Sequence, residues 1–255
     1  MNKIFDKHIV LISGALGDIG KAIAVAFARH GASIALGDIR TEDQASVFKS
    51  ELTLFGVQVH YHKVDVSNAS AVADWISLVE NTLGVPDIVI ANAATVTIAG
   101  VEKVTPMQWA NEIDINLNGS FYVTQAAANK LIEKGIAGRI VFIGSWAAHA
   151  VHPNLPAYSV SKAGIRMLCK CMALELASHQ ILVNEIAPGY VDAGLSAAVW
   201  KTNPEFSEQA RQRVPVKKLI TADQVARQVL LVCDPENVHM TGSTILMDGG
   251  LSLLT

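Results

Sequence analysis

Tyr158 and Lys162 carry the side chains whose types and spacing most clearly suggest chemistry. They are four residues apart at the start of an apolar segment, 157–176, that is typical of a helix. On a helix this spacing places both side chains on one face, one turn apart. A phenol ionises near pH 10, and a neighbouring ammonium group favours the phenolate. We therefore expect Lys162 to lower the pKa of Tyr158 and enable proton exchange, although such pairs also occur in ordinary helices where the Lys extends to solvent.

A second group of residues, glycines near the N-terminus, suggests a phosphate site. Gly14, Gly17 and Gly20 lie between the first apolar run and the next helical segment. Glycines at such a turn let the backbone approach a pyrophosphate, which binds at the helix N-terminus. Five residues separate Gly14 from Gly20 and Ala22 provides no hydroxyl, which disfavours a nucleoside-triphosphate loop. The strict G-x-G-x-x-G pattern is not matched either, so the turn alone indicates only a phosphate site.

Asp38 strengthens this interpretation. It ends the second apolar run, 18 residues after Gly20. An acid at this distance can accept hydrogen bonds from the adenosine ribose hydroxyls. A carboxylate there would repel a 2′-phosphate, which favours NAD over NADP, although nearby Arg40 weakens that preference. The alternative is an ordinary loop or cap residue.

The elements that must position these residues alternate along the chain. The apolar runs are His8–Ser13, Ala32–Gly37, Val57–Val64, Asp87–Ala91, Arg139–Gly144, Ile181–Ala187 and Ser243–Met247. The helical segments between them are Asp18–His30, Thr41–Phe55, Ala69–Leu83, Pro106–Lys134, Ala157–Ala177 and Ala222–Cys233. Strand followed by helix implies parallel pairing through right-handed crossovers. The sequence therefore predicts an α/β, Rossmann-type doubly wound sheet of seven parallel strands with helices on both faces.

We expect residues 1–255 to form one dinucleotide-binding and catalytic domain. The segment 192–215 lacks clear strand character and is expected to be a substrate lid, because excursions at strand ends often carry such lids.

The composition of the chain argues against several classes of partner and location. The chain of 255 residues is 51% hydrophobic and 17% charged, with a net charge of −3 and no basic cluster, so we expect no nucleic-acid partner. The first eight residues are too polar for a signal peptide, and no apolar run is long enough to span a membrane. Three cysteines without paired spacing argue for a reducing compartment, and we expect a cytoplasmic protein.

Several motifs now share one order along the alternating strands and helices. They are Gly14 to Gly20, Asp38, Asp65-Val66, Asn92-Ala93-Ala94, Asn116, Ser145, Tyr158 with Lys162, and Pro188-Gly189. With these motifs the chain resembles the short-chain dehydrogenase/reductase family, in its compact single-domain branch. The resemblance extends from about Lys7 to Gly250.

The resemblance implies four catalytic residues. Tyr158 matches the family's acid/base, and Lys162 the residue that lowers its pKa and holds the nicotinamide ribose. Ser145 lies 13 residues before Tyr158, as the substrate-orienting serine of the family does. Asn116 matches the residue that holds a water joining Lys162 to a proton relay.

The resemblance also implies a cofactor site for NAD, with NADP less favoured. Its residues would be Gly14, Gly17, Asp18, Ile19, Gly20, Asp38, Asp65, Val66, Asn92, Tyr158, Lys162, Pro188, Gly189 and Val191. Three positions depart from the family pattern, namely Asp18 and Ala94 in place of glycines and Ala193 in place of a frequent threonine. We expect Asp18 to cap the following helix and to point away from the phosphate.

The implied activity is an NAD(P)-dependent hydride transfer with a secondary alcohol or ketone, namely a sugar, a polyol or a cyclic alcohol. Enoyl-reducing relatives have a longer spacing between Tyr and Lys, so Tyr158 and Lys162 favour C–O over C=C chemistry. The alternative is a dinucleotide-binding sensor or scaffold that has lost the chemistry. Such proteins usually lack the Tyr or the Lys, and this chain keeps both.

The substrate pocket is expected to be formed by residues 146–155, Tyr190 and the lid. Its side chains would be Trp146, His149, His152, Asn154, Tyr190, Leu195 and Trp200. The expected substrate contacts are Ser145, Trp146, His152, Tyr158 and Tyr190. No metal is expected, because neither His60/His62 nor His149/His152 has a cysteine or acid to complete a ligand set.

The resemblance further implies a homotetramer. The contacting segments would be 106–134, 157–177 and 243–255. The last residues are apolar for a free terminus, which fits burial against another subunit.

Overall fold

Seven strands form one parallel sheet in this computed structural model, which describes residues 3–194 and 204–254. The strands are β1 (Ile9–Ser13), β2 (Ser33–Asp38), β3 (Val59–Lys63), β4 (Ile88–Ala91), β5 (Gly138–Ile143), β6 (Ile181–Pro188) and β7 (Thr244–Met247). Their order is β3-β2-β1-β4-β5-β6-β7, and every neighbouring pair is parallel. The predicted fold class is confirmed. The order reverses between β1 and β4, where such sheets open a crevice at the carboxyl ends of their strands.

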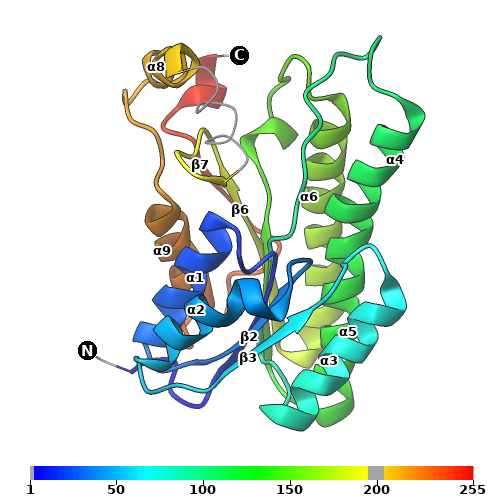
Figure 1. Cartoon of the computed structure of the whole chain (residues 1–255), viewed down its shortest axis with the longest axis vertical. Helices are drawn as coiled ribbons and strands as arrows, with labels where there is room; N and C mark the ends of the chain where they lie inside the picture. The colour runs from blue at the N-terminus through cyan, green and yellow to red at the C-terminus, as the bar shows by residue number, and fades with distance from the viewer. Residues whose placement is uncertain (1–2, 195–203, 255) are drawn as a thin grey trace.

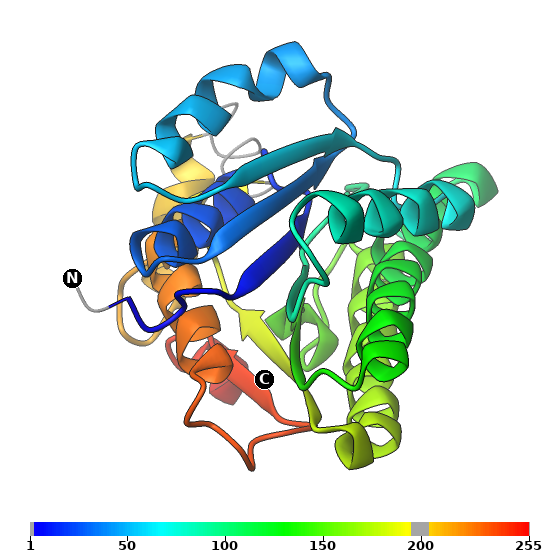
Figure 2. The ribbon, with the colours of Figure 1, turned by 90° about the horizontal axis from the view of Figure 1, so that it is seen from below.

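Helices cover both faces of the sheet (Figures 1 and 2). One face carries α1 (Asp18–Arg29), α2 (Glu42–Thr53) and α9 (Ala222–Cys233). The other carries α3 (Ala69–Thr82), α5 (Gly119–Lys134) and α6 (Pro156–Leu176), with α4 (Pro106–Ile113) leading into α5. The helix α8 (Pro204–Arg213) lies at the end of the molecule near the C-terminus (Figure 1).

Two hydrophobic cores lie on the two sides of the sheet. In β1, Val10 and Ile12 pack toward α1 and α9, whereas Leu11 between them packs toward α3 and α5. Successive side chains of a strand point to opposite faces, so apolar runs bury both faces at once. This packing explains the high apolar content of a chain with little charge.

Local signals explain where several helices begin. Thr41 and Thr105 each precede a helix that begins with a capping box, in which the side-chain oxygen of a Gln three residues later accepts a hydrogen bond from the threonine backbone N–H. Pro106 occupies the first turn of α4, where the missing N–H costs nothing. At the other end of α5, Gly135 adopts the left-handed conformation that ends helices.

The predicted helix 106–134 is helical over its whole length, but it is not one regular α-helix. A π-helical turn, η1 (Asp114–Asn118), separates α4 from α5. Asn116 lies in this turn, where its carbonyl accepts a hydrogen bond from Ser120 and its side chain bonds the backbone of Thr95. Such turns are rare and often occur at functional sites. Contacts with a distant loop, rather than a local pattern, stabilise this one.

The membrane-span, cysteine and lid expectations can be compared with the described residues. Among the described helices, none is long and apolar enough to cross a bilayer. All three cysteines lie in described segments and are free thiols, Cys169 and Cys233 buried and Cys171 exposed. The expected lid falls partly outside the described residues, which exclude Leu195 and Trp200.

Candidate active site

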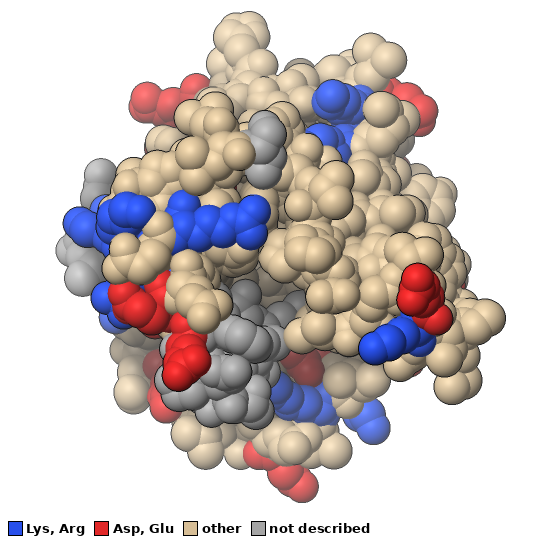
Figure 3. All heavy atoms as spheres, turned by 90° about the horizontal axis from the view of Figure 1, so that it is seen from above, with Lys and Arg blue, Asp and Glu red and all other residues tan. Residues whose placement is uncertain are grey.

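A cavity of about 690 Å³ opens at the carboxyl ends of the strands. Most predicted cofactor and catalytic residues line it: Gly14, Gly17, Asp18, Ile19, Asp38, Asp65, Val66, Asn92, Ser145, Tyr158, Lys162, Pro188, Gly189 and Val191. Gly20, Asn116, Trp146, His152 and Tyr190 are not among its lining residues in the described part of the chain. On the face seen from above in Figure 3, Lys and Arg are interspersed with Asp and Glu, without a field of one sign.

The turn after β1 brings backbone close to backbone. Gly14 has a φ of +63°, and a Cβ there would lie 2.7 Å from the Cα of Ala93. Asn92 donates from its side chain to the carbonyls of Ser13 and Gly14, at 3.1 and 3.0 Å. Gly17 is the N-cap of α1, and a Cβ on Gly20 would collide with the carbonyl oxygen of Gly14. The turn therefore offers the free N-terminus of α1 to an anion, as a pyrophosphate requires.

Asp18 does not cap α1, contrary to expectation. It is the first residue of the helix, after Gly17, and its carboxylate accepts a hydrogen bond from the Gly194 backbone at 2.7 Å. The carboxylate is therefore engaged by the segment that follows β6, which lies 176 residues away in the chain.

Asp38 joins the tip of β2 to the phosphate turn. Its carboxylate accepts hydrogen bonds from the backbone N–H groups of Leu16 at 2.9 Å and Arg40 at 3.2 Å. Arg40 donates from its guanidinium to the carbonyl of Leu16 at 2.7 Å. Both side chains line the cavity, so a carboxylate and a guanidinium lie where an adenosine ribose would bind.

The remaining predicted cofactor residues follow the ends of β3 and β6. Asp65 accepts hydrogen bonds from the backbone and hydroxyl of Ser67, and Val66 beside it is buried. Pro188 is the last residue of β6, and Gly189 packs so closely that a Cβ would lie 2.8 Å from the Cα of Asp248. These residues form the two walls on either side of the phosphate turn.

Tyr158 and Lys162 lie one turn apart on α6, as expected from their spacing. Lys162 is 3% exposed and donates to the Ile143 carbonyl at 2.7 Å, with its Nζ 5.6 Å from the centre of the Tyr158 ring. Burial lowers the pKa of Lys162 to about 8, against the opposing charges of Glu185 and Glu112. Such a lysine can exchange protons near neutral pH.

The pKa of Tyr158 is raised in this structure, so the expected lowering of that pKa by Lys162 stays a prediction for the complex with cofactor. Burial raises the pKa of Tyr158 above 10, the hydrogen bond with Ser145 opposes that rise, and the charge of Glu112 adds to it. Burial disfavours a phenolate as it disfavours any charge, and here burial is the largest cause of the shift. The phenol is therefore protonated at neutral pH in the protein alone.

Ser145 follows β5 and lies against both the cavity and Tyr158. Its Oγ accepts a hydrogen bond from the Ala147 backbone at 3.1 Å, which begins the short helix Trp146–Ala148. Its hydroxyl also hydrogen-bonds Tyr158. Two hydroxyls from different elements thus meet at one point of the cavity wall, where they can hold a single substrate oxygen.

Asn116 lies behind the cavity wall rather than on it. It is fully buried, with its side-chain oxygen accepting from the Thr95 backbone at 2.8 Å and its amide donating to the Ser161 hydroxyl at 3.1 Å. Both Thr95 and Ile115 line the cavity. Asn116 thus supports the cavity wall from behind, through Thr95, and joins it to α6 through Ser161.

Three of the predicted substrate residues pack on one another. Trp146, His152 and Tyr190 form an aromatic cluster with ring centres 5.4–6.2 Å apart and edge-to-face angles. Leu251 from the C-terminal segment packs against this cluster. The described residues contain no group of three or more His, Cys, Asp and Glu side chains arranged to hold a metal ion.

Sequence reasoning missed two buried carboxylates near the predicted catalytic residues Tyr158 and Lys162. Glu112 and Glu185 are both fully buried, and each has one side-chain oxygen without a hydrogen-bond partner in the described residues. Glu185 interrupts the otherwise apolar strand β6. A charge in such a strand is a recognisable signal, because unpaired charges are rarely buried. Glu112 lies in an ordinary amphipathic helix and gives no such signal.

The cavity fits a dinucleotide in size and in chemistry. Its volume lies within the range of cofactor pockets. The glycine turn at its floor admits a pyrophosphate, Asp38 can accept from ribose hydroxyls, and the opposite end holds Ser145, Tyr158 and Lys162.

Comparison with known proteins gives matches over nearly the whole chain. A family model described as enoyl-(acyl carrier protein) reductase matches residues 14–252. A D-beta-hydroxybutyrate dehydrogenase of Rhizobium meliloti (strain 1021) is 33% identical over 253 residues, which is 94% of this chain and 96% of that protein. A crystal structure of a short-chain type dehydrogenase/reductase from Mycobacterium marinum has a TM-score of 0.90 at 28% identity and covers 98% of both chains. The crystal structure of an NAD+-bound xylitol dehydrogenase also has a TM-score of 0.90 at 28% identity, covering 96% of this chain and 99% of that one.

Proposed function

Because this chain belongs to the short-chain dehydrogenase/reductase family, we propose that it transfers a hydride between NAD and a secondary alcohol or ketone. The observation that carries the proposal is the meeting of Ser145, Tyr158 and Lys162 at one end of a dinucleotide-sized cavity. A phosphate turn and a ribose-binding acid lie at the other end, so the cofactor and the proton-transfer group share one cavity.

The nicotinamide supplies the hydride chemistry when bound, and the chain supplies position and proton flow. In ketone reduction, Tyr158 Oη donates its proton to the carbonyl oxygen of the substrate, and Ser145 Oγ donates a hydrogen bond to the same oxygen. In alcohol oxidation Tyr158 must first lose its proton, and its raised pKa opposes this loss. Activity in the oxidation direction should therefore rise with pH, whereas reduction is served by the phenol present at neutral pH.

C–O chemistry is favoured over C=C chemistry, although the matching family model is described by an enoyl reductase. The four-residue spacing of Tyr158 and Lys162 resembles that of the alcohol- and ketone-converting members. The relatives named above as hydroxybutyrate and xylitol dehydrogenases support this assignment. We propose a sugar, polyol or cyclic alcohol as substrate. Trp146, His152 and Tyr190 pack on one another outside the lining of the cavity, and we keep them as proposed substrate contacts beside it.

The cofactor proposal depends on Asp38. Its carboxylate is fixed by two backbone N–H groups at the cavity edge, where it would repel a 2′-phosphate. The Arg40 guanidinium, which could attract that phosphate, already binds the Leu16 carbonyl. We expect NADH to bind at least tenfold more tightly than NADPH in calorimetric titrations. Tighter binding of NADPH would contradict the assignment.

The catalytic proposal is tested by Tyr158→Phe. The variant should lose roughly 10²–10⁴-fold in kcat, because the proton donor is gone, while NADH binding is retained. Tyr122→Phe, a half-buried tyrosine of α5, is the matched control and should keep full activity. Turnover should be followed at the reduced-nicotinamide absorbance with a panel of polyols, sugars, hydroxysteroids and cyclic alcohols.

Two outcomes would overturn the proposal. Full activity of Tyr158→Phe would remove Tyr158 from the mechanism. If NADH binds but no alcohol or ketone is converted by the unmodified protein, the second candidate, a non-catalytic sensor or scaffold, replaces the enzyme.

We also propose a cytoplasmic homotetramer with α4 to α6 and the C-terminal segment at its interfaces. Met167 and Leu174 on α6 are 59% and 83% exposed, and Leu253 near the C-terminus is 86% exposed. Apolar side chains this exposed favour association. Light scattering at micromolar concentration should give about four times the mass of the chain, and a monomer would contradict the proposal.

A further inference from the structure

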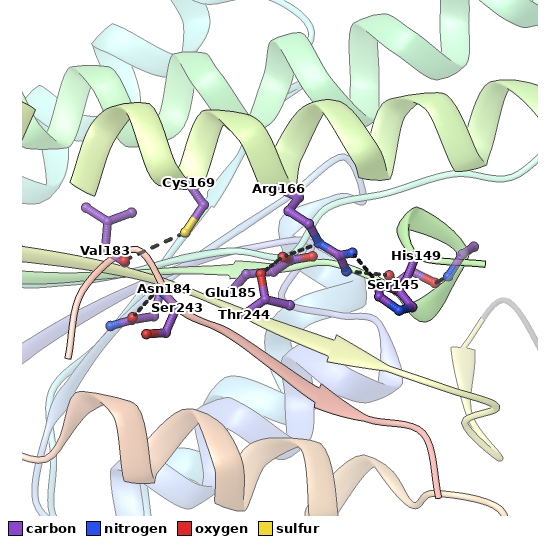
Figure 4. A network of polar contacts seen from close by, with 10 residues as sticks. Ser145, His149, Arg166, Cys169, Val183, Asn184, Glu185, Ser243 and Thr244 are labelled. Atoms are coloured by element: carbon purple, nitrogen blue, oxygen red, sulfur yellow. Dashed lines mark hydrogen bonds and ion pairs between the residues drawn. The ribbon is translucent and has the colours of Figure 1, made fainter. Parts of the chain in front are cut away.

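An ion pair between the fully buried Glu185 and Arg166, whose side chain is 16% exposed, lies next to Ser145 (Figure 4). Arg166 is on α6, one turn after Lys162, and its Nε donates to Oε2 of Glu185 at 3.0 Å. Glu185 is fully buried in β6, and the same oxygen accepts a hydrogen bond from the Thr244 hydroxyl at 2.6 Å. The pair thus links α6, β6 and β7 under the catalytic end of the cavity.

The guanidinium reaches beyond its partner to the loop that carries Ser145. Its Nη2 donates to the Ser145 carbonyl at 3.4 Å, and its Nη1 lies 3.5 Å from Nδ1 of His149 (Figure 4). Arginine can do this because its planar fork holds several donors in fixed directions, whereas lysine is a point charge.

Residues 143–145, at and just after the end of β5, are therefore contacted by side chains from α6 and β6. Lys162 donates to the Ile143 carbonyl, and Arg166 donates to the Ser145 carbonyl. Between them, Gly144 lies against Oε1 of Glu185 so closely that a Cβ would overlap that oxygen. The path of the backbone through this turn decides where the Ser145 hydroxyl lies.

Stability alone does not account for such a pair. A buried ion pair loses so much hydration that well-packed apolar residues of similar volume often stabilise a protein equally well. An apolar pair could not donate a hydrogen bond to the Ser145 carbonyl, and it would place no carboxylate against Gly144.

We propose that Arg166, held by Glu185, is a positioning residue that fixes the Gly144–Ser145 turn and so keeps the Ser145 hydroxyl at the cavity wall beside Tyr158. The catalytic consequence rests on the function proposed above. The positioning itself is a property of the protein alone.

The first test measures the turn without any substrate. In Arg166→Lys the charge opposite Glu185 is kept but the link to the Ser145 carbonyl is lost. Hydrogen exchange, followed by mass spectrometry, should become faster in the peptide that contains residues 144–149, where the Ala147 N–H bonds Ser145 Oγ. Arg139→Lys is the matched control, because Arg139 also donates to backbone carbonyls but lies at the opposite end of β5. Unchanged exchange in Arg166→Lys would overturn the proposal.

The second test couples Arg166 to Ser145 in a double-mutant cycle. Arg166→Lys should lower kcat/KM roughly 10- to 100-fold, since small displacements of a catalytic group are costly. In the Ser145→Ala background the same change should cost less than about threefold, because there is no hydroxyl left to position. Equal losses in both backgrounds would overturn the proposal and indicate general damage.

The outcomes separate this proposal from the function on which it rests. If Ser145→Ala alone keeps full activity, the proposed role of Ser145 fails, and hydrogen exchange still decides the role of Arg166. If Arg166→Lys does not fold, Arg166→Met combined with Glu185→Gln removes both charges and leaves no unpaired ion. This double variant should show the same faster exchange at residues 144–149, and unchanged exchange would contradict the proposal.

Discussion

Two buried carboxylates set the charge around Lys162. Glu185 and Glu112 both oppose the desolvation that lowers the pKa of Lys162 to about 8. Glu112 accepts a hydrogen bond from the Thr97 backbone at 2.9 Å, and its burial raises its own pKa. The same charge raises the pKa of Tyr158. A single side chain on α4 therefore influences the pKa of both members of the proposed proton-transfer pair.

We expect Glu112→Gln to shift the pH dependence of activity. The amide can still accept from Thr97, but the negative charge near Tyr158 is gone, so the pKa of Tyr158 falls. In the oxidation direction, where the phenolate is required, the acidic limb of kcat/KM should move to lower pH. Measured pH profiles test this, with Glu102→Gln, an exposed carboxylate of the preceding loop, as the control. A shift to higher pH would contradict the assignment.

At the scale of elements, the turn between β1 and α1 depends on one backbone conformation. Gly14 combines a positive φ with contact against the backbone of Ala93. Either property alone disfavours a side chain, and together they force the turn to move. A moved turn would also displace the backbone N–H groups that we propose for binding the cofactor phosphates.

Gly14→Ala should therefore weaken cofactor binding more than it weakens folding. We expect at least a tenfold rise in the Kd of NADH by fluorescence titration. Gly56→Ala is a matched control, because Gly56 also has a positive φ, of +76°, but its Cβ would meet nothing within 4 Å. It should cost only about 1 kcal/mol of stability, the penalty for a left-handed residue, with no change in Kd. Equal Kd values for the two variants would show that the crowding at Gly14 is unimportant.

An ion pair joins β1 and β4 at their amino ends, which are the ends away from the cavity. His8 Nδ1 lies 2.5 Å from the Asp87 carboxylate, which also accepts from the Ile9 backbone. The hydrogen bond to Asp87 raises the pKa of His8 above 6.5, against the effect of burial. Because the folded pKa exceeds the unfolded one, the stabilisation is full below about pH 6.5 and is lost as pH rises through the folded value.

The free energy of unfolding should thus decrease as pH rises above 6.5, and His8→Asn should remove this dependence. The His8 side chain is 32% exposed, so we expect a contribution below about 1 kcal/mol. Urea unfolding at several pH values measures it, with exposed His179→Asn as control. The pair lies at the end of the sheet away from the cavity, and kcat should not change.

At the scale of the whole molecule, the cavity joins parts of the chain that are far apart in sequence. Its lining residues come from Gly14 to Gly194, and they follow the ends of six strands. A ligand in this cavity contacts both halves of the sheet. Its binding energy therefore contributes to the stability of the whole fold.

NADH should accordingly protect the entire chain against unfolding. At a free concentration of 100 times its Kd, a single-site ligand adds about 2.7 kcal/mol to the free energy of unfolding. A rise in Tm by calorimetry would record this, and Gly14→Ala should show a smaller rise at the same NADH concentration. No rise in the unmodified protein would contradict a nicotinamide cofactor in this cavity.

The sequence by itself determined the parts that follow from local patterns. Apolar runs alternating with amphipathic segments predict the strands, the helices and their parallel order, because period and length are properties of neighbouring residues. The glycines after β1, the acid at the end of β2 and the four-residue spacing of Tyr158 and Lys162 are equally local. Each of these residues lines the cavity except Gly20, which packs against the carbonyl of Gly14.

Only the tertiary structure decided the features that depend on residues far apart in the chain. Asp18 meets Gly194 across 176 residues, and Asn116 meets Thr95 from a π-helical turn within the expected helix. Arg166 meets both Glu185 and the Ser145 carbonyl, and no spacing rule connects the three. The direction in which the pKa of Tyr158 shifts depends on how deeply its side chain is buried. Burial and long-range charge are set by the packed molecule, so no local pattern can carry them.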